Sequence, residues 1–323
     1  MNKDIRNIFI LILFPYLYLF PHTFQFIEMG NDFELLYYSY KKYIFEFLNV
    51  GHLPLWSPSE SLGYSLIFNP FAQYFYPLSW ILYLIGYLIG DLSKQLYLLY
   101  TIFGISIYGV GQYLWLKVLK IDIKYCFFST LIICMGLKLN EILRFPNAIH
   151  TFCWFPWILY AMTISIKKNI FLKPIIIIFF STFCIFTAGY PYFVFYGVIF
   201  FSFYFFFITL TNVNKLIFEK KDIDTRFKYF LKISIPALLA LIFVSPWLTG
   251  IQEIMEITRN RNLDDISYSR IIGSDFVDHV GSWIFPPMSQ AETNYYPGSI
   301  IVLAILLYLV NFLKNSQKFK FEK

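Results

Sequence analysis

Long apolar runs recur along most of this 323-residue chain, with short polar segments between them. A run of about 20 apolar residues is long enough to cross roughly 30 Å of hydrocarbon as a helix. The runs are apolar on every face, whereas the strands of a membrane barrel alternate between apolar and polar residues. The pattern therefore predicts eight membrane-spanning helices, at residues 8–27, 96–116, 125–139, 151–166, 174–188, 192–210, 231–250 and 298–312.

The composition agrees with this pattern, since 58% of the residues are hydrophobic, 22% are aromatic and only 14% are charged. Residues 1–323 are therefore predicted to form a single integral membrane domain of the all-α, polytopic class. The first run follows Lys3 and Arg6, contains Pro15 and Pro21, and has no small-residue cleavage site. It is predicted to be an uncleaved first span.

A further apolar segment, residues 77–89, either crosses the membrane or lies along its outer surface. If it lies along the surface, 18 of the 26 Lys and Arg residues fall in loops and ends on one side. Basic residues concentrate on the cytoplasmic side of membrane proteins. If the segment crossed, Lys117, Lys120 and Lys124 would lie on the wrong side. The charges thus predict a multi-pass protein of the cell membrane with both termini in the cytoplasm.

The basic charge of the chain predicts a lipid partner and no nucleic acid. The net charge is +6, and the lysines lie in short loops beside predicted spans, where anionic head groups attract them. No Gly-rich phosphate loop or zinc-ligand spacing accompanies them, and the four histidines are scattered. Glycines in the span at 96–116 and the four cysteines, all within predicted spans, are expected to pack against neighbouring helices.

Three outer segments face one another in this topology, at residues 28–95, 140–150 and 251–297. In the first, Asp32 and Glu34 follow the first span closely, so both carboxylates lie near the lipid boundary. A carboxylate there can accept the proton of an attacking hydroxyl, or hold a divalent cation such as Mg²⁺ or Mn²⁺ on its oxygens. The alternative is that both are solvated loop charges.

The rest of the first outer segment is predicted to be ordered. Residues 37–48 have a helical pattern, and prolines at positions 54, 58, 70 and 77 restrict the backbone. The aromatic side chains of Trp56 and Tyr76 have two interpretations. They anchor the segment at the membrane interface, which is the usual role of such residues, or they line a groove for a glycan or an isoprenoid chain.

The other two outer segments contain candidate partners for a substrate phosphate. Glu141 and Arg144 are three residues apart, a spacing that suits a local ion pair; alternatively Glu141 faces the Asp32 site and Arg144 faces a lipid phosphate. Arg259 and Arg261 offer planar guanidinium groups that match phosphate oxygens. Acidic residues outnumber them locally, so an internally paired segment is the competing interpretation.

Several of these motifs resemble those of a known family. The run Gly51-His52-Leu53-Pro54-Leu55-Trp56-Ser57-Pro58, Gly63, Asn69-Pro70-Phe71-Ala72-Gln73 and Tyr76-Pro77 resemble the first outer loop of YfhO-like bacterial membrane proteins, which are similar to GT-C glycosyltransferases. Later landmarks are shorter: Gly189-Tyr190-Pro191, the stretch from Ser245-Pro246-Trp247 to Arg259, and Tyr296-Pro297-Gly298. The resemblance covers most of the chain, although members of that family are usually much longer.

The resemblance implies a GT-C-like helix bundle with surface helices in its first outer loop, which agrees with the surface placement of residues 77–89. It also implies an acidic pair in that loop, here Asp32 and Glu34, and sugar donors carried on polyprenyl phosphate. The expected site residues are Asp32 and Glu34 for catalysis, with Trp56, Gln73, Tyr76, Glu141, Arg144, Arg259 and Arg261 for substrate binding.

The resulting interpretation is a membrane glycosyltransferase that transfers a sugar from a polyprenyl-phosphate donor to an extracytoplasmic glycan, lipid or cell-envelope polymer. Asp32 is expected to act as base, or to orient a metal or hydroxyl, and an arginine to stabilise the departing phosphate. Two alternatives stay open. One is a non-enzymatic binder or transporter of lipid-linked sugars, and the other is an inactive, truncated partner subunit of another membrane protein.

Overall fold

The computed structural model describes residues 3–58, 63–136, 142–167, 172–210 and 223–257. Nearly all of them belong to one unit, Met1–Met135 with Ile142–Thr258, whereas a second unit comprises Gly136–Glu141 and Arg259–Lys323. The predicted span at 298–312 and most of the predicted outer segment 251–297 lie outside the described residues. The expected single domain over the whole chain therefore stays a prediction.

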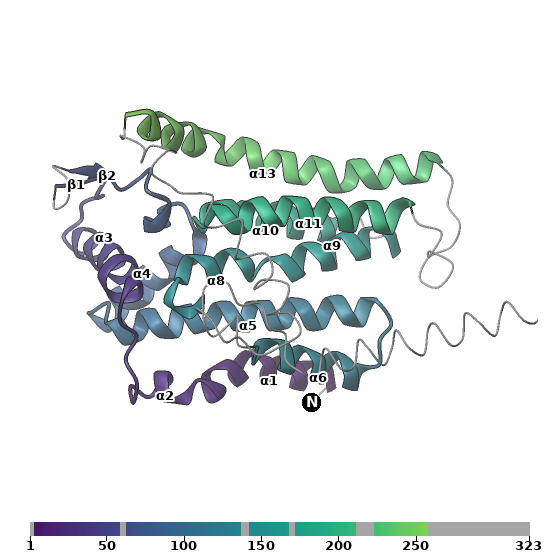
Figure 1. Cartoon of the computed structure of the whole chain (residues 1–323), viewed down its shortest axis with the longest axis horizontal. Helices are drawn as coiled ribbons and strands as arrows, with labels where there is room; N and C mark the ends of the chain where they lie inside the picture. The colour runs from purple at the N-terminus through teal and green to yellow at the C-terminus, as the bar shows by residue number, and fades with distance from the viewer. Residues whose placement is uncertain (1–2, 59–62, 137–141, 168–171, 211–222, 258–323) are drawn as a thin grey trace, which may run out of the picture. The chain divides into compact units, whose positions relative to one another are not determined.

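The described part of the chain is mostly helical, as the apolar runs predict. Its longer helices stack side by side into a layered bundle, with α5 packed between α1, α6 and α9, and α10 packed between α9 and α13 (Figure 1). These helices are α1 (Lys3–Tyr18), α5 (Lys94–Val118), α6 (Ile123–Cys134), α9 (Phe155–Lys167), α10 (Leu172–Thr187), α11 (Pro191–Leu210) and α13 (Ile223–Ile257).

Three predicted spans differ from the observed helices. The run at 125–139 corresponds to α6, which ends at Cys134. The run at 8–27 is not one helix: α1 ends at Tyr18 and a short helix, α2 (Phe20–Thr23), follows a turn. Pro21 lacks the N–H that a continuing helix would bond, so the helix breaks there. The run at 151–166 begins earlier, with α8 (Pro146–Phe152), and is interrupted before α9.

Glycines on α5 permit close helix contacts, as predicted. A methyl group added to Gly104 would lie 2.5 Å from Ile149 Cγ2, and one on Gly111 would lie 2.7 Å from the indole of Trp157. Both neighbours belong to the segment that forms α8 and α9. Small residues therefore let α5 approach this segment closely. The four cysteines are buried and free, in agreement with their expected packing role.

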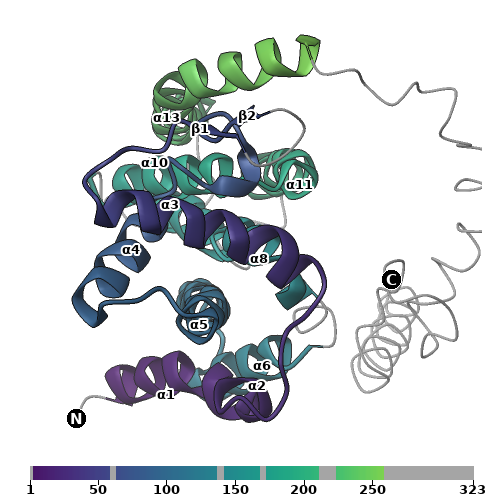
Figure 2. The same cartoon turned by 90° about the vertical axis from the view of Figure 1, so that its left-hand side faces the viewer.

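Elements of the first outer segment cover one end of the bundle. They are a π-helical turn (Phe33–Tyr38), α3 (Ser39–Asn49), the antiparallel strands β1 (Trp56–Ser57) and β2 (Tyr64–Ser65), a single 3-10 turn (Pro70–Ala72) and α4 (Pro77–Ile89). Figure 2 looks toward this end and shows α3 and α4 from the side, while α5 is seen end on. We call these elements the end cap. Residues 77–89 thus lie across the end of the bundle.

Length and hydropathy identify two candidate membrane spans in the described part of the chain, Pro146–Ile166 and Lys228–Ile254. Four shorter apolar helices accompany them: Pro77–Ile89, Ile123–Cys134, Leu172–Thr187 and Pro191–Phe206. The all-α class is therefore observed, whereas a bundle of eight membrane spans stays a prediction.

Candidate functional site

The predicted acidic pair lies in the end cap, on either side of a buried anchor. Asp32 directly precedes the π-helical turn, and Glu34 is in its first turn. Between them Phe33 is fully buried, and its ring lies 5.1 Å from that of Tyr97 on α5. Because the Phe33 side chain is held against the bundle, its two neighbours remain nearer the surface: Asp32 is exposed and Glu34 is half-buried.

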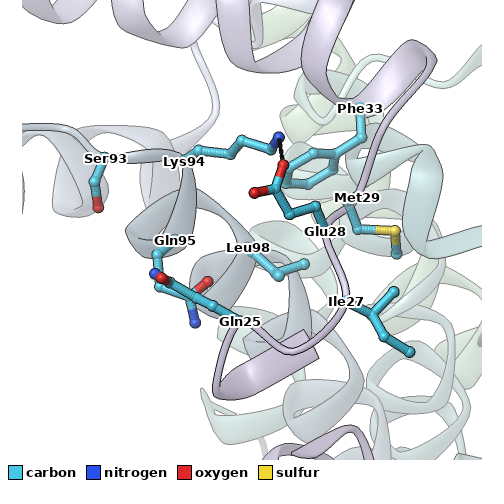
Figure 3. Close-up of a pocket in the computed structure, with 9 residues that line it drawn as sticks. All are labelled: Gln25, Ile27, Glu28, Met29, Phe33, Ser93, Lys94, Gln95 and Leu98. Atoms are coloured by element: carbon cyan, nitrogen blue, oxygen red, sulfur yellow. Dashed lines mark hydrogen bonds and ion pairs between the residues drawn. The ribbon is translucent and has the colours of Figure 1, made fainter. Parts of the chain in front are cut away.

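Lys94, the first residue of α5, binds the second carboxylate of the pair. Its ammonium lies 2.9 Å from Glu34. It also lies 3.1 Å from Glu28, a contact that Figure 3 shows. Desolvation lowers the pKa of Lys94, but its hydrogen bonds to Glu34 and Glu28 outweigh this effect and hold the pKa above its usual value. No hydrogen bond or ion pair joins the Asp32 carboxylate to another residue in the described ranges. Asp32 is therefore the more available proton acceptor.

A cavity of about 230 Å³ opens beside this cluster, between the chain that precedes the acidic pair and the start of α5. Its walls combine amides and charges with apolar side chains, as Figure 3 shows. The lining residues are Gln25, Ile27, Glu28, Met29, Phe33, Ser93, Lys94, Gln95 and Leu98. The Glu34–Lys94 ion pair thus adjoins a small polar cavity, and the exposed Asp32 directly precedes Phe33 of the cavity wall.

Two of the predicted substrate-binding residues are fully buried. Gln73 donates a hydrogen bond to the Ala188 carbonyl at 2.8 Å, from a left-handed backbone conformation with φ of 52°. The Tyr76 hydroxyl lies 3.1 Å from His150 Nδ1 and accepts a hydrogen bond from the Trp154 indole at 3.0 Å. A side chain without exposed surface cannot contact a ligand in this conformation. Gln73 and Tyr76 therefore position the end cap on the bundle.

Of the other predicted binding residues, the structure describes Trp56 and Arg144. Trp56 is 57% exposed on β1, and its indole lies so close to Gly63 that a methyl group there would be 2.4 Å from Nε1. The Arg144 guanidinium lies over the Phe145 ring, at 4.6 Å from its centroid. Glu141, Arg259 and Arg261 lie outside the described residues, so their predicted contacts with Asp32 or with phosphate stay predictions.

Residues that are distant in sequence contact the turn at Pro70–Ala72 and the chain just before it. Asn147 on α8 donates a hydrogen bond to the Pro70 carbonyl at 3.1 Å. Gly189, directly after α10, lies against the same carbonyl. From α13, the Trp247 indole donates to the Ile67 carbonyl at 2.8 Å. Contacts from α8, from the turn after α10 and from α13 therefore hold the end cap in place.

Sequence reasoning missed Lys41, which is fully buried on α3. Its Nζ atom donates to the Ala72 carbonyl at 2.9 Å and to Ser79 Oγ at 2.7 Å. Burial lowers the pKa of Lys41 well below its usual value. A signal was present in the sequence, because position 41 falls on the helical stripe that contains the buried residues Tyr37, Tyr40, Ile44 and Phe45.

Replacing Lys41 by Met is expected to flatten the pH dependence of stability. The pKa of Lys41 is lower in the folded chain than its ordinary value of 10.5, so between these two values the unfolded chain binds one more proton than the folded chain. The free energy of unfolding therefore rises with pH through this window. Thermal unfolding midpoints of the purified protein, measured between about pH 6 and 9, test this.

The matched control for Lys41 is its neighbour Lys42, whose pKa is raised by a hydrogen bond to Asp91. Its titration lies above the tested range, so Lys42→Met is expected to keep the slope of the unaltered chain. If the unfolding midpoint changes equally with pH in the Lys41→Met protein and in the unaltered protein, the Lys41 amine is not neutral in the folded chain.

The described part of the chain provides no further ligands for a metal ion bound to Asp32 and Glu34. No group of three or more His, Cys, Asp or Glu side chains is gathered there in a way that could hold an ion. The Lys94 ammonium already lies against Glu34. A Mg²⁺ or Mn²⁺ ion on Asp32 and Glu34 therefore stays a prediction.

Comparison with protein-family models, curated proteins and solved structures finds no match to this chain. The site must therefore be interpreted from its own residues.

Proposed function

We propose that the protein is a GT-C-type membrane glycosyltransferase whose site lies at the end cap. The observation that carries this proposal is the Glu34–Lys94 ion pair at a small polar cavity, with the exposed Asp32 directly preceding Phe33, a residue of the cavity wall. An exposed carboxylate without an ion-pair partner is suited to accept a proton from a bound hydroxyl. The resemblance of the surrounding loop to YfhO-like proteins supports a sugar on polyprenyl phosphate as the donor.

In the proposed reaction, an acceptor hydroxyl attacks the anomeric carbon of the donor sugar. Asp32 accepts the hydroxyl proton as the new C–O bond forms. The bond between the anomeric carbon and the phosphate oxygen breaks on the opposite face, so polyprenyl phosphate leaves with its electron pair and the configuration is inverted. Glu34, held by Lys94, orients the acceptor. Arg259 or Arg261 neutralises the departing phosphate.

The exposed surface of the helix bundle supports a location in the membrane. Large apolar side chains are exposed there, among them Leu238, Ile242 and Phe243 of α13 and Phe203 of α11. Such surface is unfavourable in water, whereas lipid chains solvate it. We propose a multi-pass protein of the cell membrane with eight spans, both termini in the cytoplasm and the end cap on the extracytoplasmic face.

The charge at the other end of the bundle supports this orientation. Lys117, near the end of α5, forms an ion pair with Asp4 at the start of α1. Lys120 and Lys124 follow in the turn to α6 and its first residues. Basic residues therefore gather beside the N-terminal segment, away from the end cap (Figure 1). The positive-inside rule assigns such a cluster to the cytoplasm.

A single cysteine at position 120 tests this orientation. In a chain whose four buried cysteines are replaced by serine, Lys120→Cys is expected to resist an impermeant thiol reagent in intact cells and to react after permeabilisation. A cysteine at Asp91, at the end-cap side, is the matched control and is expected to react without permeabilisation. Reaction at position 120 in intact cells would reverse the proposed topology.

The function is tested by incubating the purified full chain with a radiolabelled sugar on polyprenyl phosphate and a hydroxylated acceptor. Transfer of label to the acceptor, with release of polyprenyl phosphate, is the expected result. Retention of the donor without any transfer would instead favour a binder or transporter of lipid-linked sugars. Activity that appears only after a second membrane subunit is added would favour the partner-subunit alternative.

A further inference from the structure

The cavity beside Lys94 has the size of a site for a small ligand. Its volume of about 230 Å³ is below the roughly 300–1,000 Å³ of pockets that hold drug-sized ligands. A single sugar ring fits this volume, whereas a disaccharide or a hydrocarbon chain exceeds it. The cavity opens at the surface of the end cap, because Glu28 on its rim is 81% exposed.

Hydrogen-bonding groups in the walls match the hydroxyls of a sugar. Gln25 and Gln95 contribute amides, and Ser93 contributes a hydroxyl. The Gln95 Nε2 group donates to the Thr23 carbonyl at 2.5 Å, which fixes the amide and leaves its Oε1 atom as an acceptor. Planar amides and carboxylates bind adjacent hydroxyl groups because they present two polar atoms side by side.

Apolar residues form the remaining walls of the cavity. Ile27, Met29, Phe33 and Leu98 line it together with the polar groups. A sugar ring has C–H faces as well as hydroxyls, so it buries apolar surface against such walls while its hydroxyls bond to the amides. A fully charged or fully apolar ligand would use only one of these two features.

The charge of the lining selects against anions. Glu28 and Glu34 contact one ammonium, that of Lys94, and Asp32 is two residues before Glu34 in the sequence. A ligand carboxylate or phosphate would face these carboxylates and compete with them for Lys94. Bringing like charges together in a partly enclosed site is unfavourable. The phosphate-bearing end of a donor therefore belongs elsewhere.

We propose that this cavity is an acceptor subsite that binds one neutral sugar ring and rejects sugars that carry a carboxylate or phosphate group. The inference rests on the proposed function for the role of the ligand as acceptor, and it deepens that function by naming the acceptor class. Binding itself needs no donor and no transfer, so it is measured separately.

Calorimetric titration of the purified full chain with methyl glucoside, galactoside and mannoside tests the proposal. At least one of these neutral glycosides is expected to bind about tenfold or more tightly than its matching uronic acid or inorganic phosphate. Absence of binding by all three glycosides, or equal binding of the uronic acid, overturns the proposal. Tighter binding of phosphate overturns it too, and would assign the cavity to an anion held by Lys94.

Two variants separate the contribution of hydrogen bonding from that of charge. Gln25→Ala removes an exposed amide and is expected to weaken glycoside binding about tenfold. Glu28→Gln removes one negative charge from the rim and is expected to strengthen binding of the uronic acid while the glycoside is held as before. Unchanged discrimination in the Glu28→Gln protein contradicts the charge argument.

The control for these variants is Lys42→Gln, which disrupts another lysine–carboxylate contact of the end cap, that with Asp91, outside the cavity. It is expected to leave binding of every probe unchanged. The two proposals fail in different ways. Loss of sugar transfer with glycoside binding intact opposes the glycosyltransferase function, and transfer without glycoside binding opposes the acceptor subsite.

Discussion

Asp32→Asn is expected to lower sugar transfer by about 10²-fold or more while the protein keeps its fold. Asparagine has nearly the shape of aspartate but cannot accept the acceptor's proton. The structure gives two reasons to expect an intact fold: Asp32 is exposed, and no hydrogen bond or ion pair joins its carboxylate to another described residue. The measurement is initial transfer rate with a polyprenyl-phosphate sugar, alongside the thermal unfolding midpoint.

Comparison with two other carboxylates sharpens this test. Glu34→Gln is expected to cost less activity, because Lys94 already neutralises Glu34 and fits it for orienting a substrate. Asp91→Asn is the matched control, since Asp91 is an exposed carboxylate of the same end cap that pairs with Lys42 at 2.5 Å. Exposed pairs contribute little to stability, so this variant is expected to stay near the unaltered rate.

Full transfer by the Asp32→Asn protein, in a preparation where the unaltered chain is active, removes Asp32 from the proposed mechanism. Glu141 is then the next carboxylate to replace. A loss of activity that is equal in the Asp32→Asn and Asp91→Asn proteins would show a general sensitivity of the end cap to charge, and would likewise oppose a specific base.

Apolar runs predicted the long helices well, because a helix in a bundle of this kind is apolar over most of its length. The predicted run at 96–116 corresponds to α5, and those at 174–188 and 192–210 correspond to α10 and α11. The error at 8–27 has a local cause. Hydropathy does not register the missing N–H of Pro21, which ends the first helix early.

The candidate site was predictable only in part, because its partners come from distant positions. Asp32 and Glu34 were identified from their place after the first run, whereas Lys94 reaches Glu34 only once α5 folds against the end cap. Aromatic residues show the same limit. Sequence cannot distinguish an interfacial tyrosine from a buried one, and Tyr76 proved to be buried against His150.

Buried contacts of the end cap explain why its short motifs contain particular small residues. Gly189 follows α10 with φ of +79°, a conformation that favours glycine and commonly ends helices. Its α-carbon also lies against the backbone of the Pro70 turn, where there is no room for a side chain. Glycine is therefore required at position 189 for two independent reasons, one local and one tertiary.

Gly189→Ala is accordingly expected to have the largest effect on stability among the substitutions considered. The new methyl group would lie 1.9 Å from the Pro70 carbonyl oxygen, and backbone atoms cannot move aside as a flexible side chain can. The loss should exceed about 4 kcal/mol, the range in which single substitutions are exceptional. The loss of stability is measured by thermal unfolding of the detergent-solubilised protein, with size-exclusion chromatography to monitor the folded fraction.

Gly51→Ala separates the two causes, because Gly51 has the same φ of +79° but no atom within 4 Å of the added methyl group. Left-handed strain alone should cost about 1–2 kcal/mol there. A much larger loss at position 189 therefore measures the contact between the end of α10 and the Pro70 turn. Equal midpoints for the two variants would mean that the end cap moves away from α10 at little cost, and that the cavity and the Asp32 carboxylate are held in place by other contacts.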